Sequence, residues 1–143
     1  ALAAKLDKLD YTVYCSMGDG ELNEGECWEA FMCINKFKLD NIVVFIDRNK
    51  IQLSGTSDDI MPLEPLKQKL KAFNFNVLEA DGHDFEHILK AFEKAKKSKE
   101  PSVIIFNTIM GKGVEFMENS YKWHGVAPSK EEEAEALKIL KNA

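Results

Sequence analysis

The sequence predicts an α/β fold, in which a doubly wound and mostly parallel sheet carries helices on both faces. Short apolar segments alternate along the chain with longer segments of helical periodicity, which is the pattern of repeated strand–helix units. Residues 42–46 and 103–106 are continuous apolar runs, as expected of parallel strands that are covered on both faces. Right-handed crossovers then bring successive strands into one sheet.

The individual elements follow from local signals. Residues 1–6 are strong helix formers but have no cap before them and no initiator methionine, so we expect the end of a helix there. Pro62 suits the first turn of a helix, Asp84 suits an N-cap, and Ser129 with Glu132 makes a capping-box pattern. The expected elements are strands at 11–17, 41–47, 74–79 and 102–107, helices at about 24–38, 62–72, 84–97 and 129–141, and loops at 49–61 and 108–128.

Length and composition are those of one ordinary domain. A chain of 143 residues can build a core of its own, so we expect a single domain over residues 1–143. The net charge of −5 does not favour a nucleic acid or an anionic membrane as partner. No apolar run reaches the roughly 18–20 residues of a membrane span and no signal peptide is visible, so we expect a cytoplasmic protein. Cys15, Cys27 and Cys33 fit no zinc spacing and are expected to be buried thiols.

Two polar side chains follow two of the expected strands. Asp19, within Gly18-Asp19-Gly20, comes after the first strand, and Asn49 comes after the second. The spacing between Gly20 and Asn49 is that of one βαβ crossover, so a carboxylate and a carboxamide should reach the carboxyl edge of the sheet. In open α/β sheets this edge is where ligands bind.

This pair predicts a site for Mg²⁺ and a diphosphate. Asp and Asn offer hard oxygen ligands, and Mg²⁺ takes few protein groups and completes its octahedron with phosphate and water. Gly20 lets the backbone approach an anion closely, and a helix beginning near Asn23 would point its free N–H groups the same way. On its own, however, Gly-Asp-Gly is a common turn that binds nothing.

Longer motifs carry a family resemblance. They are GDGELNEGECWEA at 18–30, KLDNIVVFIDRNKIQ at 38–52, DGHD at 81–84, GKGV at 111–114 and WHGVAP at 123–128. The Gly-Asp-Gly motif, a spacer and then Asn resemble the thiamine diphosphate signature, and the motifs together resemble a transketolase. They look most like the amino-terminal, pyrophosphate-binding subunit of the split transketolases. The resemblance implies the thiamine diphosphate-binding fold, with this chain corresponding to the later half of such a subunit.

The resemblance assigns roles to site residues. It implies Mg²⁺ held by Asp19, Asn49 and the backbone carbonyl of Ile51. The cofactor-binding residues that it implies are Gly18, Gly20, Asn49, Leu53 and His124. Leu53 would pack near the thiazolium ring, or else be a plain loop hydrophobe. His124 would lie beside cofactor and substrate as a catalytic residue that donates to a phosphate or a developing alkoxide, or else be a loop histidine satisfied by backbone.

Other positions allow two interpretations or depart from the family pattern. Glu24 can be an acid that complements the dipole at a helix start, and Glu29 a solvated helix residue. The resemblance instead implies that both are acids at a subunit interface. Arg48 departs from the paired asparagines of the broad signature. Met110 replaces a lysine that family members often carry there. His83 and His87 are four residues apart, but His83 precedes the expected helix, so we expect no metal pair.

The implied function is that of a transketolase-type transferase moving a two-carbon ketol unit between sugar phosphates of the pentose phosphate type. The implied partners are the pyrimidine-binding, carboxy-terminal subunit of the split enzyme and a second copy in a dimer. Because the glutamate that activates the cofactor belongs to the other domain, we expect this chain alone to be inactive. The alternatives are a 1-deoxyxylulose-5-phosphate synthase-like enzyme and a folded assembly module without cofactor. A calcium loop is excluded because Glu24 stands where its glycine is needed.

Overall fold

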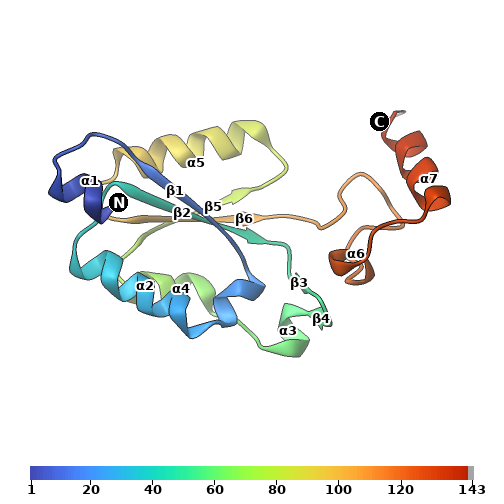
Figure 1. Ribbon diagram of the computed structural model, residues 1–143, viewed down its shortest axis with the longest axis horizontal. Coiled ribbons are helices and arrows are strands. Elements are labelled where there is room, and N and C mark those ends of the chain that lie inside the picture. The colour runs from blue at the N-terminus through green and yellow to red at the C-terminus, as the bar shows by residue number, and fades with distance from the viewer. Residues whose placement is uncertain (142–143) are drawn as a thin grey trace.

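The computed structural model describes residues 1–141 and is built around a four-stranded parallel sheet (Figure 1). The strands lie in the spatial order β1 (Val13–Gly18), β2 (Ile42–Arg48), β6 (Ser102–Asn107) and β5 (Asn76–Asp81). All three neighbouring pairs are parallel, so every strand ends at the same edge of the sheet. The expected α/β fold with a parallel sheet is therefore confirmed.

The two continuous apolar runs are the two central strands. In β6 every residue from Ser102 to Phe106 is buried, and β2 buries Val43, Val44 and Ile46. The edge strands β1 and β5 instead alternate between more and less exposed residues. A central parallel strand has neighbours on both sides and helices on both faces, which is why only these two strands lack polar alternation.

Helices cover both faces of the sheet (Figure 1). α2 (Gly25–Lys36) and α4 (Leu66–Ala72) lie on one face, and α5 (Phe85–Lys97) lies on the other. Under α2 and α4, the ring of Phe31 meets that of Phe75 edge-on at 5.2 Å and is 1% exposed. Under α5, Ala91 and Ala95 pack against Val43, Ile104 and Phe106. Short α1 (Leu2–Leu6) precedes β1.

Two further segments lie beyond the carboxyl ends of the strands (Figure 1). The first contains the hairpin of β3 (Ile51–Gln52) and β4 (Gly55–Thr56), followed by α3 (Ser57–Ile60). The second contains α6 (Lys122–Gly125) and α7 (Lys130–Leu140). The hairpin, α3 and α6 occupy regions that were expected to be loops, whereas α7 is the expected final helix. The caps at Asp84 and Ser129 are confirmed, the latter as a full capping box with Glu132.

The expected helix start at Pro62 is wrong. α4 begins at Leu66 with Pro65 as its N-cap, and Pro62 lies before it in irregular structure. Pro65 disfavours the helical conformation at Glu64, the residue before it. The carboxylate of Glu64 instead accepts the free N–H of Leu66 at 2.9 Å, so the helix begins only after the second proline.

The expectation of buried thiols holds for one cysteine of the three. Cys27 is buried in the core under α2, whereas Cys33 is exposed and Cys15 is half-buried. Cys33 lies on the outer face of α2, and Cys15 lies on an edge strand that lacks a neighbour on one side within the described residues. None of the described helices has both the length and the apolar character to cross a membrane.

Candidate functional site

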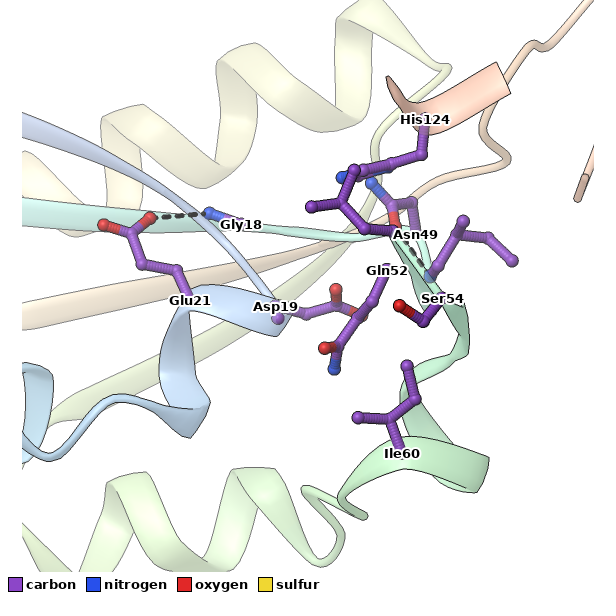
Figure 2. Close-up of a pocket in the computed structure, with 11 residues that line it drawn as sticks. Gly18, Asp19, Glu21, Asn49, Gln52, Ser54, Ile60 and His124 are labelled. Carbon is purple, nitrogen blue, oxygen red and sulfur yellow. Dashed lines mark hydrogen bonds between the residues drawn. The ribbon is translucent and has the colours of Figure 1, made fainter. Parts of the chain in front are cut away.

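A cavity of about 570 Å³ opens at the carboxyl ends of β1 and β2 (Figure 2). Its walls include all seven site residues that the sequence predicts, namely Gly18, Asp19, Gly20, Asn49, Ile51, Leu53 and His124. They come from separate segments of the chain, and His124 is far from the others along the sequence. Glu21, Gln52, Ser54 and Ile60, which were not predicted, complete the lining.

The register of β1 against β2 brings Asp19 and Asn49 together. Gly18, the last residue of β1, lies opposite Asp47, and the N–H of Asp19 continues the pairing to the carbonyl oxygen of Asp47 at 3.1 Å. Asn49 follows the last residue of β2 directly. Both polar residues are thus the first to leave adjacent strands, which is the arrangement that the crossover spacing predicts.

Asp19 is held in a buried ion pair with Arg48. The Asp19 side chain is 1% exposed and the Arg48 side chain 3% exposed. Oδ2 of Asp19 accepts from Nη1 of Arg48 at 2.5 Å and from the backbone N–H of Lys50 at 2.8 Å. Within the described residues, both of these hydrogen bonds end on Oδ2, so Oδ1 is the carboxylate oxygen left for a ligand.

Arg48 stays charged in this setting. Burial by itself would lower its pKa, but hydrogen bonds from its guanidinium to Asp19 and Glu64, and the charges of both acids, raise the pKa above the ordinary value. Nη2 of Arg48 lies 3.1 Å from Oε1 of Glu64. Glu64 also accepts the first N–H of α4. Arg48 therefore connects Asp19, which lines the cavity, to the start of that helix.

The backbone turn after β2 aims two N–H groups into the site. Lys50 adopts a φ of 62°, in the left-handed region that non-glycine residues seldom occupy. This turn directs the N–H of Lys50 to Asp19 and the N–H of Ile51 to Oδ1 of Asn49, the latter at 2.9 Å. The side-chain amide of Asn49 also donates to Oδ2 of Asp47 at 2.9 Å.

The two glycines of the Gly-Asp-Gly motif differ in the space around them, because a Cβ on Gly18 would meet no atom within 4 Å, whereas one on Gly20 would meet a side chain. The N–H of Gly18 donates to Oε2 of Glu21 at 3.1 Å and is already engaged (Figure 2). Gly20 begins the short 3-10 helix η1 (Gly20–Asn23), and a Cβ there would come within 3.0 Å of the Gln52 side chain. Gln52 in turn donates to Oδ1 of Asn23 at 2.9 Å. Glycine at position 20 therefore lets the β3 segment approach the strand end.

The far wall of the cavity is built by the hairpin and α6. Leu53, in the hairpin turn, is 69% exposed, and a Cβ on Gly125 would lie only 2.7 Å from its Cδ2. The hairpin and α6 therefore touch at this point. α6 is held by Trp123, whose Nε1 donates to the carbonyl of Phe116 at 3.2 Å. His124 projects from α6 toward the cavity (Figure 2), in a short helix where a loop was expected.

The remaining singled-out residues lie elsewhere. Glu24 is the N-cap of α2, and Glu29 is exposed on that helix. Nε2 of His83 accepts the N–H of Ile109 at 2.7 Å, whereas His87 lies on α5 beside Asp84. Among residues 1–141, no three His, Cys, Asp or Glu side chains gather as metal ligands do.

The buried pairing of Arg48 with Asp19 is the feature of the site that sequence reasoning missed. Arg48 was treated as a departure from a signature, yet it occupies a buried position at the end of β2. The available signal was an arginine within an apolar strand, since a buried charge needs a partner. That partner is Asp19, which directly follows the last residue of the neighbouring strand β1, just as Arg48 is the last residue of β2.

Residues 3–141 match the family described as transketolase, thiamine diphosphate binding domain. The chain belongs to the transketolase family. It is 45% identical over 139 residues to one subunit of the apulose-4-phosphate transketolase of Phocaeicola vulgatus, covering 96% of this chain and 50% of that protein. It is 42% identical to the 6-deoxy-6-sulfo-D-fructose transketolase subunit SqwG of a Clostridium species, covering 92% of this chain and 48% of that protein. The chain thus spans about half the length of these curated relatives.

Solved transketolases share the fold. The enzyme from Campylobacter jejuni superimposes with a TM-score of 0.87 at 38% identity, covering 96% of this chain and 22% of that one. The enzyme from Leishmania mexicana superimposes with a TM-score of 0.83 at 30% identity, covering 92% of this chain and 20% of that one. The chain therefore corresponds to a thiamine diphosphate-binding domain of the transketolase family.

Proposed function

We propose that this chain holds the diphosphate end of thiamine diphosphate, through Mg²⁺, as one part of a transketolase-type transferase. The observation that carries the proposal is the meeting of Asp19, Asn49 and Ile51 in one cavity at the carboxyl ends of β1 and β2. The family of the matching domain supplies the cofactor class. In this proposal residues 1–143 form a single cofactor-binding domain.

The chemistry of the donor set suits Mg²⁺. Oδ1 of Asp19 and Oδ1 of Asn49 are hard oxygens, and a small number of protein oxygens is what Mg²⁺ takes when phosphate and water fill its other positions. Arg48 neutralises part of the Asp19 charge and holds its Oδ2, so we assign Oδ1 as the oxygen that binds the metal. The Ile51 carbonyl is the third proposed ligand, and the backbone N–H of Gly20 is the proposed donor to the diphosphate.

The rest of the cavity would serve the reacting end of the cofactor. When bound, thiamine diphosphate supplies the carbon nucleophile that cleaves the bond next to a ketone and carries the two-carbon unit. Leu53 offers apolar contact for its ring from the hairpin. His124, at the rim, can donate a proton or a hydrogen bond to a substrate oxygen that gains negative charge.

The partners and substrates follow from the relatives. Two of them are named as subunits of transketolases, one for apulose-4-phosphate and one for 6-deoxy-6-sulfo-D-fructose. The word subunit in both names supports a partner chain, which we propose to be a pyrimidine-binding subunit. We also propose a sugar phosphate as substrate, as in the name of the first relative, a dimeric assembly and a cytoplasmic location. The chain alone should be inactive, because the family resemblance places the glutamate that activates the cofactor in the other domain.

Isothermal titration of thiamine diphosphate into the protein, with Mg²⁺ or with EDTA, tests the proposal. We expect binding that requires Mg²⁺ and disappears in the Asp19→Ala variant. Glu135→Ala, which removes an exposed acid on α7, is the matched control and should bind as the parent does. Binding that is unaffected by EDTA, or retained in Asp19→Ala, would sink the magnesium site. A well-folded parent that binds no cofactor even with its partner subunit would favour an assembly module.

A further inference from the structure

We propose that Asp47 and Thr108 are positioning residues that orient the side-chain amide of Asn49 so that its oxygen, and not its nitrogen, faces the metal. The inference rests on the proposed function and adds two residues to that site. Asp47 lies at the end of β2 and Thr108 directly follows β6, the neighbouring strand. The register of these strands, with Asp47 opposite Phe106 and Arg48 opposite Asn107, places the two side chains together.

The amide of Asn49 needs such orientation because its two ends are nearly the same size. Only the oxygen can ligate Mg²⁺, whereas the nitrogen carries two protons and would repel the ion. A rotation of 180° about the last side-chain bond exchanges the two ends. A metal site that uses an Asn oxygen therefore needs a neighbour that can only accept a hydrogen bond from the amide nitrogen, or one that can only donate to the amide oxygen.

Asn49 has one neighbour of each kind. The Asp47 carboxylate is acceptor-only when ionised, and its Oδ2 takes the Asn49 amide N–H at 2.9 Å. The backbone N–H of Ile51 is donor-only, and it meets Oδ1 of Asn49 at 2.9 Å (Figure 2). Flipping the amide would break both hydrogen bonds. It would place the amide oxygen against the Asp47 carboxylate and the amide nitrogen against the Ile51 N–H. Asp47 therefore selects the orientation in which the oxygen is presented.

Thr108 holds Asp47 in place. Asp47 is exposed, so its carboxylate would rotate freely or reach for the cation itself. The Thr108 hydroxyl donates a hydrogen bond to Oδ1 of Asp47, so each carboxylate oxygen has its own donor. The backbone N–H of Thr108 also bonds to the carbonyl of Arg48 at 3.4 Å, which ties the two strand ends together.

The Asp81-Gly82-His83-Asp84 motif, which the proposed function does not otherwise use, supports Thr108 from the other side. A Cβ on Gly82 would lie 2.4 Å from Cγ2 of Thr108, so only glycine leaves space for the threonine. Nε2 of His83 accepts the N–H of Ile109, the next residue, at 2.7 Å. The motif after β5 thus packs against the end of β6, which in turn holds the end of β2.

Metal affinity in the assembled enzyme is the decisive readout. Binding of Mn²⁺, followed by electron paramagnetic resonance at saturating thiamine diphosphate, reports the site without requiring turnover. We expect Asp47→Asn to weaken Mn²⁺ binding by about 10–100-fold, the usual effect of removing a group that orients a metal ligand. Thr108→Val, which keeps both the shape and the Asp47 charge, should weaken it by about 3–10-fold, and Thr108→Ser should restore it.

Controls separate orientation from charge and from folding. Glu93→Gln removes an exposed negative charge on α5 and should leave Mn²⁺ binding unchanged. Excess Mg²⁺ should restore kcat in Thr108→Val, because orientation limits metal occupancy and not the chemical step. Urea unfolding checks that each variant is folded, and Thr108→Ser separates loss of the hydroxyl from loss of packing.

Two results would overturn the inference. In one, Asp47→Asn and Thr108→Val bind Mn²⁺ as the parent does while Asn49→Ala does not, which leaves the proposed function standing without the positioning residues. In the other, Thr108→Val and Thr108→Ser are equally impaired, so the hydroxyl has no part. If Asn49→Ala itself binds Mn²⁺ normally, the proposed magnesium site fails as well.

Discussion

The two walls of the cavity are built in different ways. The strand-end wall is formed by Asp19 and Asn49, together with Arg48, which is paired with Asp19 but does not itself line the cavity. These residues leave or end adjacent parallel strands and bond to one another or to their neighbours. The hairpin wall, defined as Leu53 and His124, is carried by the β3–β4 turn and by α6. Asp19 and Arg48 are almost fully buried, whereas Leu53 is 69% exposed and His124 is exposed.

The difference indicates a division of labour. The position of a residue at a strand end is fixed by the register of that strand with its neighbours, and it cannot change without disturbing the adjacent strands. The strand-end wall therefore suits the binding of a metal and a diphosphate, which need ligands at fixed positions. The hairpin wall depends on a few contacts, such as that between Leu53 and Gly125, and can change with little cost to the core. Substitutions in the strand-end wall should therefore lower both stability and metal affinity, whereas substitutions in the hairpin wall should affect turnover or contact with the cofactor ring and leave stability nearly unchanged.

Asp19→Ala should have the largest effect. Loss of a proposed ligand should weaken binding of Mg²⁺ with thiamine diphosphate by more than about 100-fold, because losing a group that only supports a ligand already costs about 10–100-fold. It also leaves Arg48 buried without its closest partner, which should lower the free energy of unfolding by about 3–5 kcal/mol. Titration calorimetry and urea unfolding measure the two effects. A stable variant that still binds would show that the strand-end wall is not a unit.

Arg48→Met should destabilise the protein by about 3 kcal/mol, because the carboxylate of Asp19 would stay buried without a counter-charge. The double variant with Asp19→Ala should be more stable than the sum of the single effects predicts, since it removes both charges. Urea unfolding of the four proteins gives the coupling free energy. Additive effects would mean that the two charges do not depend on each other.

His124→Ala should lower kcat of the assembled enzyme by about 100-fold, the lower range for loss of a proton donor. The free energy of unfolding should change by less than about 0.5 kcal/mol, because the side chain is exposed. Steady-state kinetics and urea unfolding test this split. A large loss of stability with an unchanged kcat would reverse the proposed roles of the walls.

Leu53→Ala should cause a smaller change. The side chain is mostly exposed in this structure, so we expect unfolding to shift by less than about 0.5 kcal/mol. If the ring of the cofactor packs on Leu53, its affinity should fall by about 3–10-fold, the equivalent of one or two buried methyl groups. Glu135→Ala, which changes an exposed residue on α7 away from the cavity lining, is the control. Equal affinities for all three proteins would remove Leu53 from the site.

The smallest effect concerns the pH dependence of stability at Glu64. The backbone N–H of Leu66 and then the guanidinium of Arg48 lower the pKa of this carboxyl in the folded protein. The charged form therefore stabilises the fold above the pKa of the unfolded chain, and this contribution is lost as the pH falls through the folded pKa. Glu64→Gln should be slightly less stable than the parent at neutral pH and equal to it once the pH lies below the folded pKa. Thermal unfolding across this range measures the difference.

Much of the fold follows from the sequence because its signals are local. The continuous apolar runs identified β2 and β6, and residue type at single positions identified the caps at Asp84 and Ser129. The spacing from Gly20 to Asn49 placed two polar residues at one edge, because a βαβ crossover has a narrow range of lengths. These features depend on residues near one another in the chain or on a repeated unit of fixed size.

Tertiary structure alone decided the rest. The Thr108 hydroxyl meets Asp47 across 61 positions of sequence, and Arg48 meets Asp19 across 29. No periodicity or local motif reports such pairs, because they exist only when β6 lies beside β2 and β2 beside β1. The strand order that brings them together is set by how the helices bury the faces of the sheet, a property of the whole chain rather than of any segment.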